Sequence, residues 1–326
     1  MTWIVWRQQR PMFITLAVAL AVTVAVILVW RAGMIADISA RNLLDCVRGE
    51  ADICRGTAVV NEFQNAWFMR LHVTQGLVLV VPALLGVFVG APLFAREFEQ
   101  GTHALAFTQS VSRTRWMATK FLVAAVPVLL FVGVFQVVVH SWLDAAGKLG
   151  PLGTGPFYFT TFDSQGVSPI AYTLFAYTLG MATGALFKRT LVAMTVTLGV
   201  FVAVRAALGA VRESMITPTR LLSDDVATPG GFVERGGPLV LESGFLDPQG
   251  AVVADPGSLM SCPSNGQKVT DADLAACYRK NGLAQSYADV IPVDQATTLH
   301  LLEGAIFAGL TVLLVLGSVW AVRRQV

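Results

Sequence analysis

The sequence predicts an all-α integral membrane protein with six transmembrane helices. Of its 326 residues, 55% are hydrophobic and only 13% are charged, whereas soluble domains carry about 25% charged residues. The hydrophobic residues are also grouped in long uninterrupted blocks without an amphipathic period, which is typical of segments that face lipid. Because the net charge is only +2, the composition gives no reason to expect a nucleic-acid partner.

Six stretches are long enough to cross a bilayer as helices, since a hydrocarbon core of about 30 Å needs about 20 apolar residues. The first stretch could instead be a secretory signal peptide. Its apolar run is longer than the about 7–15 residues of such a signal, and no clear small-residue cleavage site follows it, so we predict a span there as well. The six expected spans are 12–30, 76–94, 121–139, 170–187, 191–211 and 304–322.

The basic residues predict the orientation, because cytoplasmic loops are enriched in Lys and Arg. With both termini in the cytoplasm, the cytoplasmic segments would hold ten basic residues but only two acidic ones, Glu97 and Glu99. The opposite orientation would violate the rule at each short loop. We therefore expect cytoplasmic N- and C-termini. Of the 23 basic residues 18 are Arg, which together with the excess of Ala, Val and Gly hints at a GC-rich bacterial genome. The expected location is the bacterial plasma membrane, as a multi-pass protein.

This topology divides the chain into three parts. Residues 1–211 would form the first five spans and a cytoplasmic loop, 95–120. Residues 212–298 would form an extracytoplasmic, loop-rich segment between the fifth and sixth spans, with one short helix at 270–279 capped by Thr270. Residues 299–326 would form the last span and a cytoplasmic tail.

All four cysteines fall in expected outer loops. Cys46 and Cys54 lie in the first loop, 31–73, whereas Cys262 and Cys277 lie in the last. An oxidising compartment favours disulfides, and a membrane span separates the two loops, so we expect two local pairs. Four free thiols are the alternative. The spacing matches no metal-ligand pattern, and we predict no metal site.

The residues of the loop at 95–120 follow a pattern that a simple solvated connection would not require. Two glutamates precede Gly101, which predicts a helix that breaks at the glycine. Phe98 and Phe107 are apolar side chains on a cytoplasmic loop, where a partner surface or the membrane interface would have to cover them.

Within this loop, residues 96–102 read REFEQGT, residues 108–113 read TQSVSR, and Lys120 leads into the third span. This order resembles the loop between spans two and three of permease subunits of the ABC-2 class of ABC transporters, which are bacterial exporters. The resemblance implies that the loop is a coupling helix that docks on a separate ATPase subunit. The residues it assigns to ATPase coupling are Arg96, Glu97, Phe98, Glu99, Gly101, Thr102, Phe107 and Arg113.

The resemblance further implies a homodimer of permeases with two copies of the ATPase, so that ATP and Mg²⁺ would be bound by the partner subunit and no cofactor by this chain. The sequence agrees, because it contains no G-x-x-x-x-G-K-[ST] motif. We therefore predict that the chain itself is not an enzyme. Spans one to four contain no Asp or Glu, which argues against an ion-coupled carrier. Nothing in the sequence indicates the transported substrate.

Two other functions compete with the exporter. One is a membrane sensor or scaffold whose segment 212–298 binds an outside ligand without transport. The other is a polytopic membrane enzyme, but no clustered set of catalytic polar residues is evident.

Two features inside the spans also bear on function or packing. Arg205 and Glu303 are expected at similar depths near the outer leaflet, where an ion pair would avoid the cost of an unpaired charge in lipid; a role in substrate gating is the alternative. Gly180 and Gly184 form a small-x-x-x-small pattern that allows two helices to approach closely. The pattern does not decide whether this packing occurs within one subunit or across a dimer.

Overall fold

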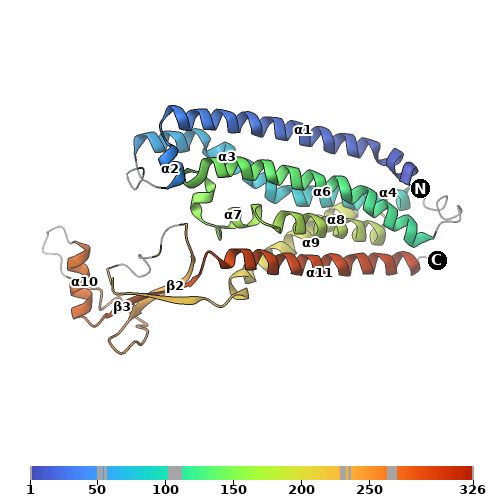
Figure 1. Ribbon diagram of the computed structural model, residues 1–326. Coiled ribbons are helices and arrows are strands. Elements are labelled where there is room, and N and C mark those ends of the chain that lie inside the picture. Colours follow the sequence, from blue (N-terminus) through green and yellow to red (C-terminus); the bar gives the residue numbers. More distant parts are fainter. Residues whose placement is uncertain are drawn as a thin grey trace. The chain divides into compact units, whose positions relative to one another are not determined.

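The computed structural model describes residues 2–49, 54, 57–101, 112–227, 233, 236–262 and 270–324 (Figure 1). The chain divides into two compact units. The first contains residues 1–153, 158–210 and 300–326 and is helical, whereas the second contains residues 154–157 and 211–299 and includes a β-sheet.

Six helical segments of the described residues are long and apolar enough to cross a membrane, which confirms the six expected spans. They are Gln9–Ala40, Ala58–Glu99, Arg115–Leu149, Ser168–Phe187, Thr190–Met215 and Gln295–Trp320. The long helices in these segments are α1 (Thr2–Ala40), α3 (Ala58–Leu85), α4 (Ala91–Glu99), α6 (Arg113–Ala146), α8 (Ser168–Phe187), α9 (Thr190–Val211) and α11 (Gln295–Arg324).

Several helices extend beyond the apolar stretches that predicted them. The expected outer loop 31–73 is largely helical, because α1 continues to Ala40 and α3 begins at Ala58. Polar contacts stabilise these extensions. The Trp67 indole donates to Asp37 at 3.0 Å, and Arg41 pairs with the same carboxylate at 2.7 Å. The apolar blocks therefore located the spans but underestimated the helix lengths.

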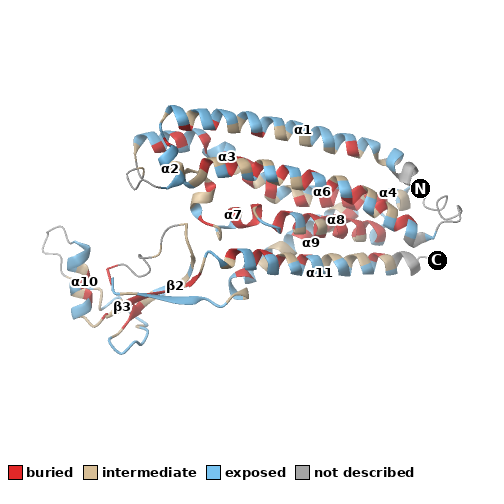
Figure 2. Ribbon diagram, viewed as in Figure 1, coloured by how far each residue is buried: buried red, intermediate tan, exposed pale blue. Residues whose placement is uncertain are grey.

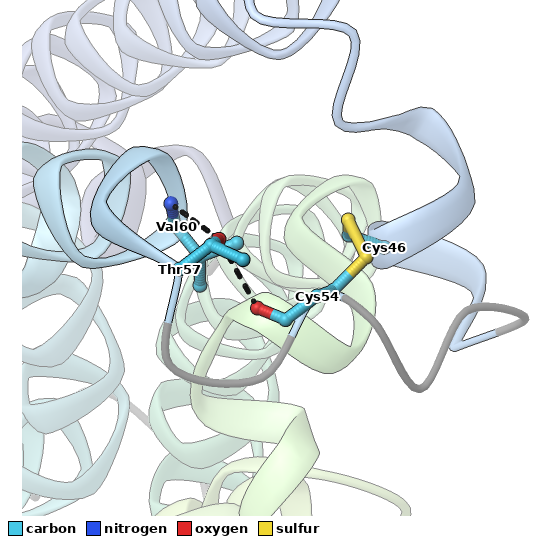
Figure 3. The surroundings of a disulfide bond; sticks show 4 residues. All are labelled: Cys46, Cys54, Thr57 and Val60. Atoms are coloured by element: carbon cyan, nitrogen blue, oxygen red, sulfur yellow. Dashed lines mark hydrogen bonds between the residues drawn. A yellow bond between two sulfur atoms is a disulfide. The ribbon is translucent and has the colours of Figure 1, made fainter.

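Short elements join the long helices. Near the first disulfide lie α2 (Leu44–Arg48), η3 (Gly147–Leu149) and η4 (Pro151–Thr154), and α7 (Phe159–Ser164) precedes α8. The described residues before α3 include the disulfide Cys46–Cys54, as predicted. Figure 3 shows that Thr57 beside it caps α3, accepting from the Val60 amide at 3.4 Å and donating to the Cys54 carbonyl at 3.3 Å.

The second span is interrupted by a π-helical turn, η2 (Gly86–Gly90), between α3 and α4. Here the span packs closely against α8. A Cβ atom built on Gly180 would lie 2.3 Å from the Gly86 carbonyl oxygen, and one on Gly184 would lie 2.5 Å from the Ala91 carbonyl oxygen. The small-residue pattern of α8 thus allows backbone contact within one chain, which settles the choice that the sequence left open.

Burial follows the same arrangement (Figure 2). The residues of η2, α8 and the first half of α4 are mostly buried, whereas the apolar side chains of α1, α9 and α11 are largely exposed on the surface of the helical unit. A surface of this kind is stable only in an apolar solvent, which agrees with a membrane location.

The second unit contains a three-stranded antiparallel sheet with the order β1-β3-β2, formed by β1 (Thr219–Ser223), β3 (Gln285–Ile291) and β2 (Leu239–Leu246). Its core contains Phe245, Tyr278 and Leu283. The sequence analysis missed this sheet, so the expected all-α fold is correct for the helical unit only. These strands lack clean alternation of polar and apolar residues, and their pairing joins segments far apart in the chain.

Two expectations for this unit are confirmed. Helix α10 (Asp271–Lys280) occupies the predicted position, with Thr270 and Asp273 forming a capping box, and Cys262 is bonded to Cys277. The sheet also carries an ion pair across β1 and β3, in which Arg220 donates two hydrogen bonds of 2.6–2.7 Å to Asp289. These hydrogen bonds hold the pKa of the Asp289 carboxyl below its usual range.

Candidate functional site

The expected coupling element begins in α4, whose buried side chains are Ala91, Leu93, Phe94 and Ala95. The helix ends at Glu99, and Gly101 follows with a φ of +68°. A residue with a side chain adopts this left-handed conformation only at a cost, so the glycine allows the chain to leave the helix. The predicted break at Gly101 is confirmed.

Part of the coupling prediction falls outside the described residues. Thr102 and Phe107 lie there, and the side chain of Arg113 is not described. The chain is described again from Ser112, which caps α6 by accepting from the Arg115 amide at 3.4 Å. The side chains of Arg96 and Arg115, on the two sides of this connection, are both exposed.

Glu97 faces the interior of the helical unit. It forms an ion pair with Lys120 of α6, whose side chain is only 3% exposed. The Lys120 ammonium also lies 4.7 Å from the centroid of the Trp116 ring, a distance at which a cation is attracted to an aromatic face. Trp116 in turn contacts Phe94 of α4, with ring centroids 5.4 Å apart. The end of α4 is therefore held against the start of α6 by charge and by aromatic packing.

Glu99 contacts a different helix. One of its carboxylate oxygens accepts from the backbone amide of Thr190 at 3.1 Å and from the Thr190 hydroxyl at 2.7 Å. Thr190 is the first residue of α9, and a carboxylate at a helix N-terminus is favoured by the exposed amides and the helix dipole. Beside it, the Lys188 ammonium lies 5.9 Å from the centroid of the Phe98 ring. Glu97, Phe98 and Glu99 thus all have contacts within this chain.

A second polar cluster lies at the opposite end of the helical unit, near α7 (Figure 1). Arg205 of α9 forms an ion pair with Asp163 of α7 at 2.5 Å, and the Asp163 side chain is fully buried. The Arg205 guanidinium lies 3.6 Å from the centroid of the Tyr172 ring. The Tyr172 hydroxyl is 2.8 Å from a carboxylate oxygen of Glu303 and 3.2 Å from one of Asp163.

The structure places Arg205 near Glu303, the residue with which the sequence analysis expected it to pair. The two residues belong to one cluster, but the ion pair described for Arg205 is with Asp163, and Tyr172 connects Glu303 to the same carboxylate. The sequence analysis missed Asp163 because it precedes the fourth apolar stretch, in a segment that reads as a loop. A carboxylate five residues before a span would have been the signal to consider.

Further polar side chains surround this cluster. The Ser168 hydroxyl lies 2.8 Å from Nδ1 of His300, and the His300 ring stacks on Phe162 with centroids 3.9 Å apart. The amide nitrogen of Gln75 donates to the Thr161 and Ser164 hydroxyls. Buried hydrogen bonds thus also connect α3 with α7 and α8 with α11.

Neither polar cluster forms a metal centre. Across the part of the chain that the structure describes, no three His, Cys, Asp or Glu side chains are grouped so that they could hold a metal ion. The two clusters contain ion pairs and hydrogen bonds, which can position helices relative to one another.

One comparison with known proteins finds a matching protein family. A family model described as "ABC-2 membrane transporter related" matches residues 17–212. This range begins within the first span and extends through most of the fifth, and it includes both glutamates of the α4 end and the connection between α4 and α6. No curated protein and no solved structure matches the chain.

Proposed function

Because the chain belongs to the ABC-2 membrane transporter related family, we propose that it is the membrane-spanning permease subunit of an ATP-driven exporter. It would form the translocation path and couple to a separate ATPase subunit through residues 96–113. Two permeases and two ATPases would make up the complex, with ATP and Mg²⁺ bound by the ATPases. The observation that carries this proposal is the family match over residues 17–212, which extends from within the first span through most of the fifth and includes the α4–α6 connection.

The arrangement of the helical unit supports a cytoplasmic location for the connection. The start of α1, the end of α4, the start of α6 and the end of α11 lie at one end of this unit (Figure 1). Basic residues gather in the segments at this end, as expected for the cytoplasmic side of a bacterial plasma membrane. They include Arg7, Arg10, Arg96, Arg115, Lys188, Arg189, Arg323 and Arg324.

The exposed arginines beside the connection are suited to binding a partner. Arg96 and Arg115 are separated by the α4–α6 connection, and neither is buried. Charged groups at the rim of an interface increase the rate of association and fix the orientation of the partner. We therefore assign initial ATPase recognition to this basic pair, together with the connection between them.

The test is to purify the intact protein from its native membranes in mild detergent and to identify co-purifying proteins by mass spectrometry. We expect a stoichiometric ATPase with a P-loop motif, whose rate of ATP hydrolysis changes when the permease is present. The double variant Arg96→Glu with Arg115→Glu should reduce its recovery at least about tenfold. The control is Lys280→Glu, at an exposed lysine of α10. Wild-type protein that is recovered intact without any ATPase would contradict the proposal.

A sensor or scaffold is the second candidate, and the unit formed by residues 154–157 and 211–299 favours it. This unit has a sheet, its own apolar core and a disulfide, which are features of an independently folded module that could bind a ligand. Such a protein would bind an outside ligand while no nucleotide-dependent partner accompanies it. The same purification therefore separates the two functions.

A further inference from the structure

The end of α4 is linked to two other spans by two neighbouring glutamates. Glu97 pairs with Lys120 near the start of α6. Glu99, two residues later, accepts two hydrogen bonds from Thr190 at the start of α9. Side chains two apart on a helix point in different directions, so each glutamate reaches a different helix. A single turn of α4 thus contacts the beginnings of two membrane spans.

In the link to α6, neither Glu97 nor Lys120 easily exchanges its ion-pair partner for another group. The Lys120 side chain is 3% exposed and that of Glu97 is 18% exposed. Breaking a pair of this kind leaves a buried charge without compensation, which is strongly unfavourable. When α4 moves, α6 will therefore follow as long as the pair is intact.

The link to α9 is of a different kind. Glu99 is exposed, but it supplies an acceptor to the first amide of α9, which has no acceptor within its own helix. The preceding residues, Lys188 and Arg189, form a short connection from α8 in which Lys188 has a φ of +54°. A movement of Glu99 therefore acts directly on the first turn of α9.

Close packing makes α4 suited to move as a rigid body with α8. The Ala91 carbonyl oxygen would lie 2.5 Å from a Cβ atom at Gly184, so the two backbones are already in contact. Sliding one helix along the other would bring larger side chains into this contact. Displacement of the connection between α4 and α6 is thus directed into α6 and α9 rather than absorbed at the α4–α8 contact.

We propose that Glu97 and Glu99 are positioning residues that transmit movement of the α4–α6 connection to α6 and α9, and that they do not bind the ATPase. This inference rests on the proposed function and refines it. Partner recognition belongs to the exposed Arg96 and Arg115, and transmission belongs to the two glutamates. The two roles predict different consequences for conservative variants of the same short segment.

The test uses the permease co-purified with its ATPase. Glu97→Gln and Glu99→Gln are compared with the wild type and with Glu213→Gln, a control at an exposed glutamate of the second unit. We expect the ATPase to be recovered in unchanged amount in all four. In the two α4 variants, the change in ATP hydrolysis caused by the permease should be smaller by between about twofold and thirtyfold, the usual range for residues that carry coupling between sites.

A distance measurement detects transmission inside the permease. Spin labels at Leu122→Cys of α6 and Leu191→Cys of α9, both exposed, report the separation of the two helices in the complex. Addition of a non-hydrolysable ATP analogue should shift this distance in the wild type, and the shift should be reduced by the same factor in the α4 variants. Exchanging the charges, with Glu97→Lys and Lys120→Glu together, should restore it, which a general loss of folding would not allow.

Three outcomes decide between the possibilities. If Glu97→Gln and Glu99→Gln lose the ATPase, the glutamates are docking groups and the inference is wrong. If the ATPase remains and both readouts match the wild type, the links do not transmit movement and the inference is again wrong, while the proposed function stands. If the wild type itself recovers no ATPase, the proposed function fails first.

Discussion

The two ends of the helical unit hold their charges in different ways. At the α7 end, Asp163 and Glu303 are at most 1% exposed and share a network with Arg205 and Tyr172. At the α4 end, Lys120 is buried, but its partner Glu97 is partly exposed and Glu99 is exposed. Both ends join several helices through ionic or hydrogen-bonded side chains, and they differ mainly in access to water.

Access to water determines how costly a rearrangement is. A fully buried charge cannot exchange its partner for water, whereas water can replace a partner of a partly exposed charge at lower cost. We therefore expect the α7 end to stay fixed when the protein changes conformation, whereas the α4 end can move with the Glu97–Lys120 pair intact while the exposed Glu99 exchanges its contact with water. In the proposed permease, this places the mobile end beside the ATPase and the fixed end on the far side.

The largest expected effect comes from breaking the ion pair at the α7 end. Asp163→Asn keeps the shape of the side chain but leaves the Arg205 charge uncompensated, which should lower the free energy of unfolding by about 3–5 kcal/mol. Thermal unfolding of the protein in detergent micelles would measure it. The control is Asp144→Asn at an exposed position of α6, which should change stability by less than about 0.5 kcal/mol.

A double variant tests the cause of this effect. Asp163→Asn combined with Arg205→Met removes both charges and should recover a large part of the lost stability, because the uncompensated charge is the main cost. If Asp163→Asn were no more destabilising than Asp144→Asn, the α7 cluster would not be the fixed end.

A smaller effect is expected at the α4 end. Lys120→Met preserves most of the aliphatic packing but removes the ion pair with Glu97 and the cation above Trp116. Because Glu97 is partly exposed, water can solvate it, and we expect a loss of about 1.5–3 kcal/mol. Unfolding in the same detergent, with Lys280→Met as the exposed control, gives the comparison. A loss as large as that of Asp163→Asn would show that the two ends do not differ.

The sequence predicted the spans better than the contacts between them. Long apolar blocks locate spans because the bilayer requires about 20 such residues, and both disulfides and the helix break at Gly101 follow from local patterns. The partner of Arg205 could not be predicted in the same way. Choosing between Asp163 and Glu303 requires the rotation of α9 and the position of α7, neither of which a hydropathy pattern contains.

The glutamates of the α4 end show the same limit. Their position before Gly101 correctly indicated a helix end, and the resemblance assigned them to ATPase coupling. Only the packing of α4 against α6, α8 and α9 reveals that Glu97 and Glu99 have partners within the chain. The sheet of residues 219–291 was missed for a related reason, since β3 pairs with strands about 40 to 70 residues away.

Between the two ends, the glycine contact of α8 tests whether the helices act as a rigid connection. Gly180→Ala would place a Cβ atom 2.3 Å from the Gly86 carbonyl oxygen and 2.6 Å from the Ala91 amide nitrogen. Backbone atoms cannot move aside as a side chain can, so we expect a loss of about 1–3 kcal/mol. Gly133→Ala in α6, which meets open space, should be neutral or stabilising by up to about 1 kcal/mol. Equal stabilities for the two variants would mean that α4 and α8 separate easily.

The smallest expected effect tests whether burial of charge or position along the span determines the resistance to rearrangement. Thr57 caps α3 at the same end as the α7 cluster, but its contact with the Val60 amide is 3.4 Å long and only partly buried. Thr57→Ala should therefore cost only about 0.5–1 kcal/mol, and Thr57→Ser should retain most of the wild-type stability because the hydroxyl remains. Thermal unfolding of both variants with the nearby disulfide intact makes the measurement. A cost close to that of Asp163→Asn would mean that the whole end is uniformly rigid. The expected small cost would show that burial of charge, and not position along the span, determines the resistance to rearrangement.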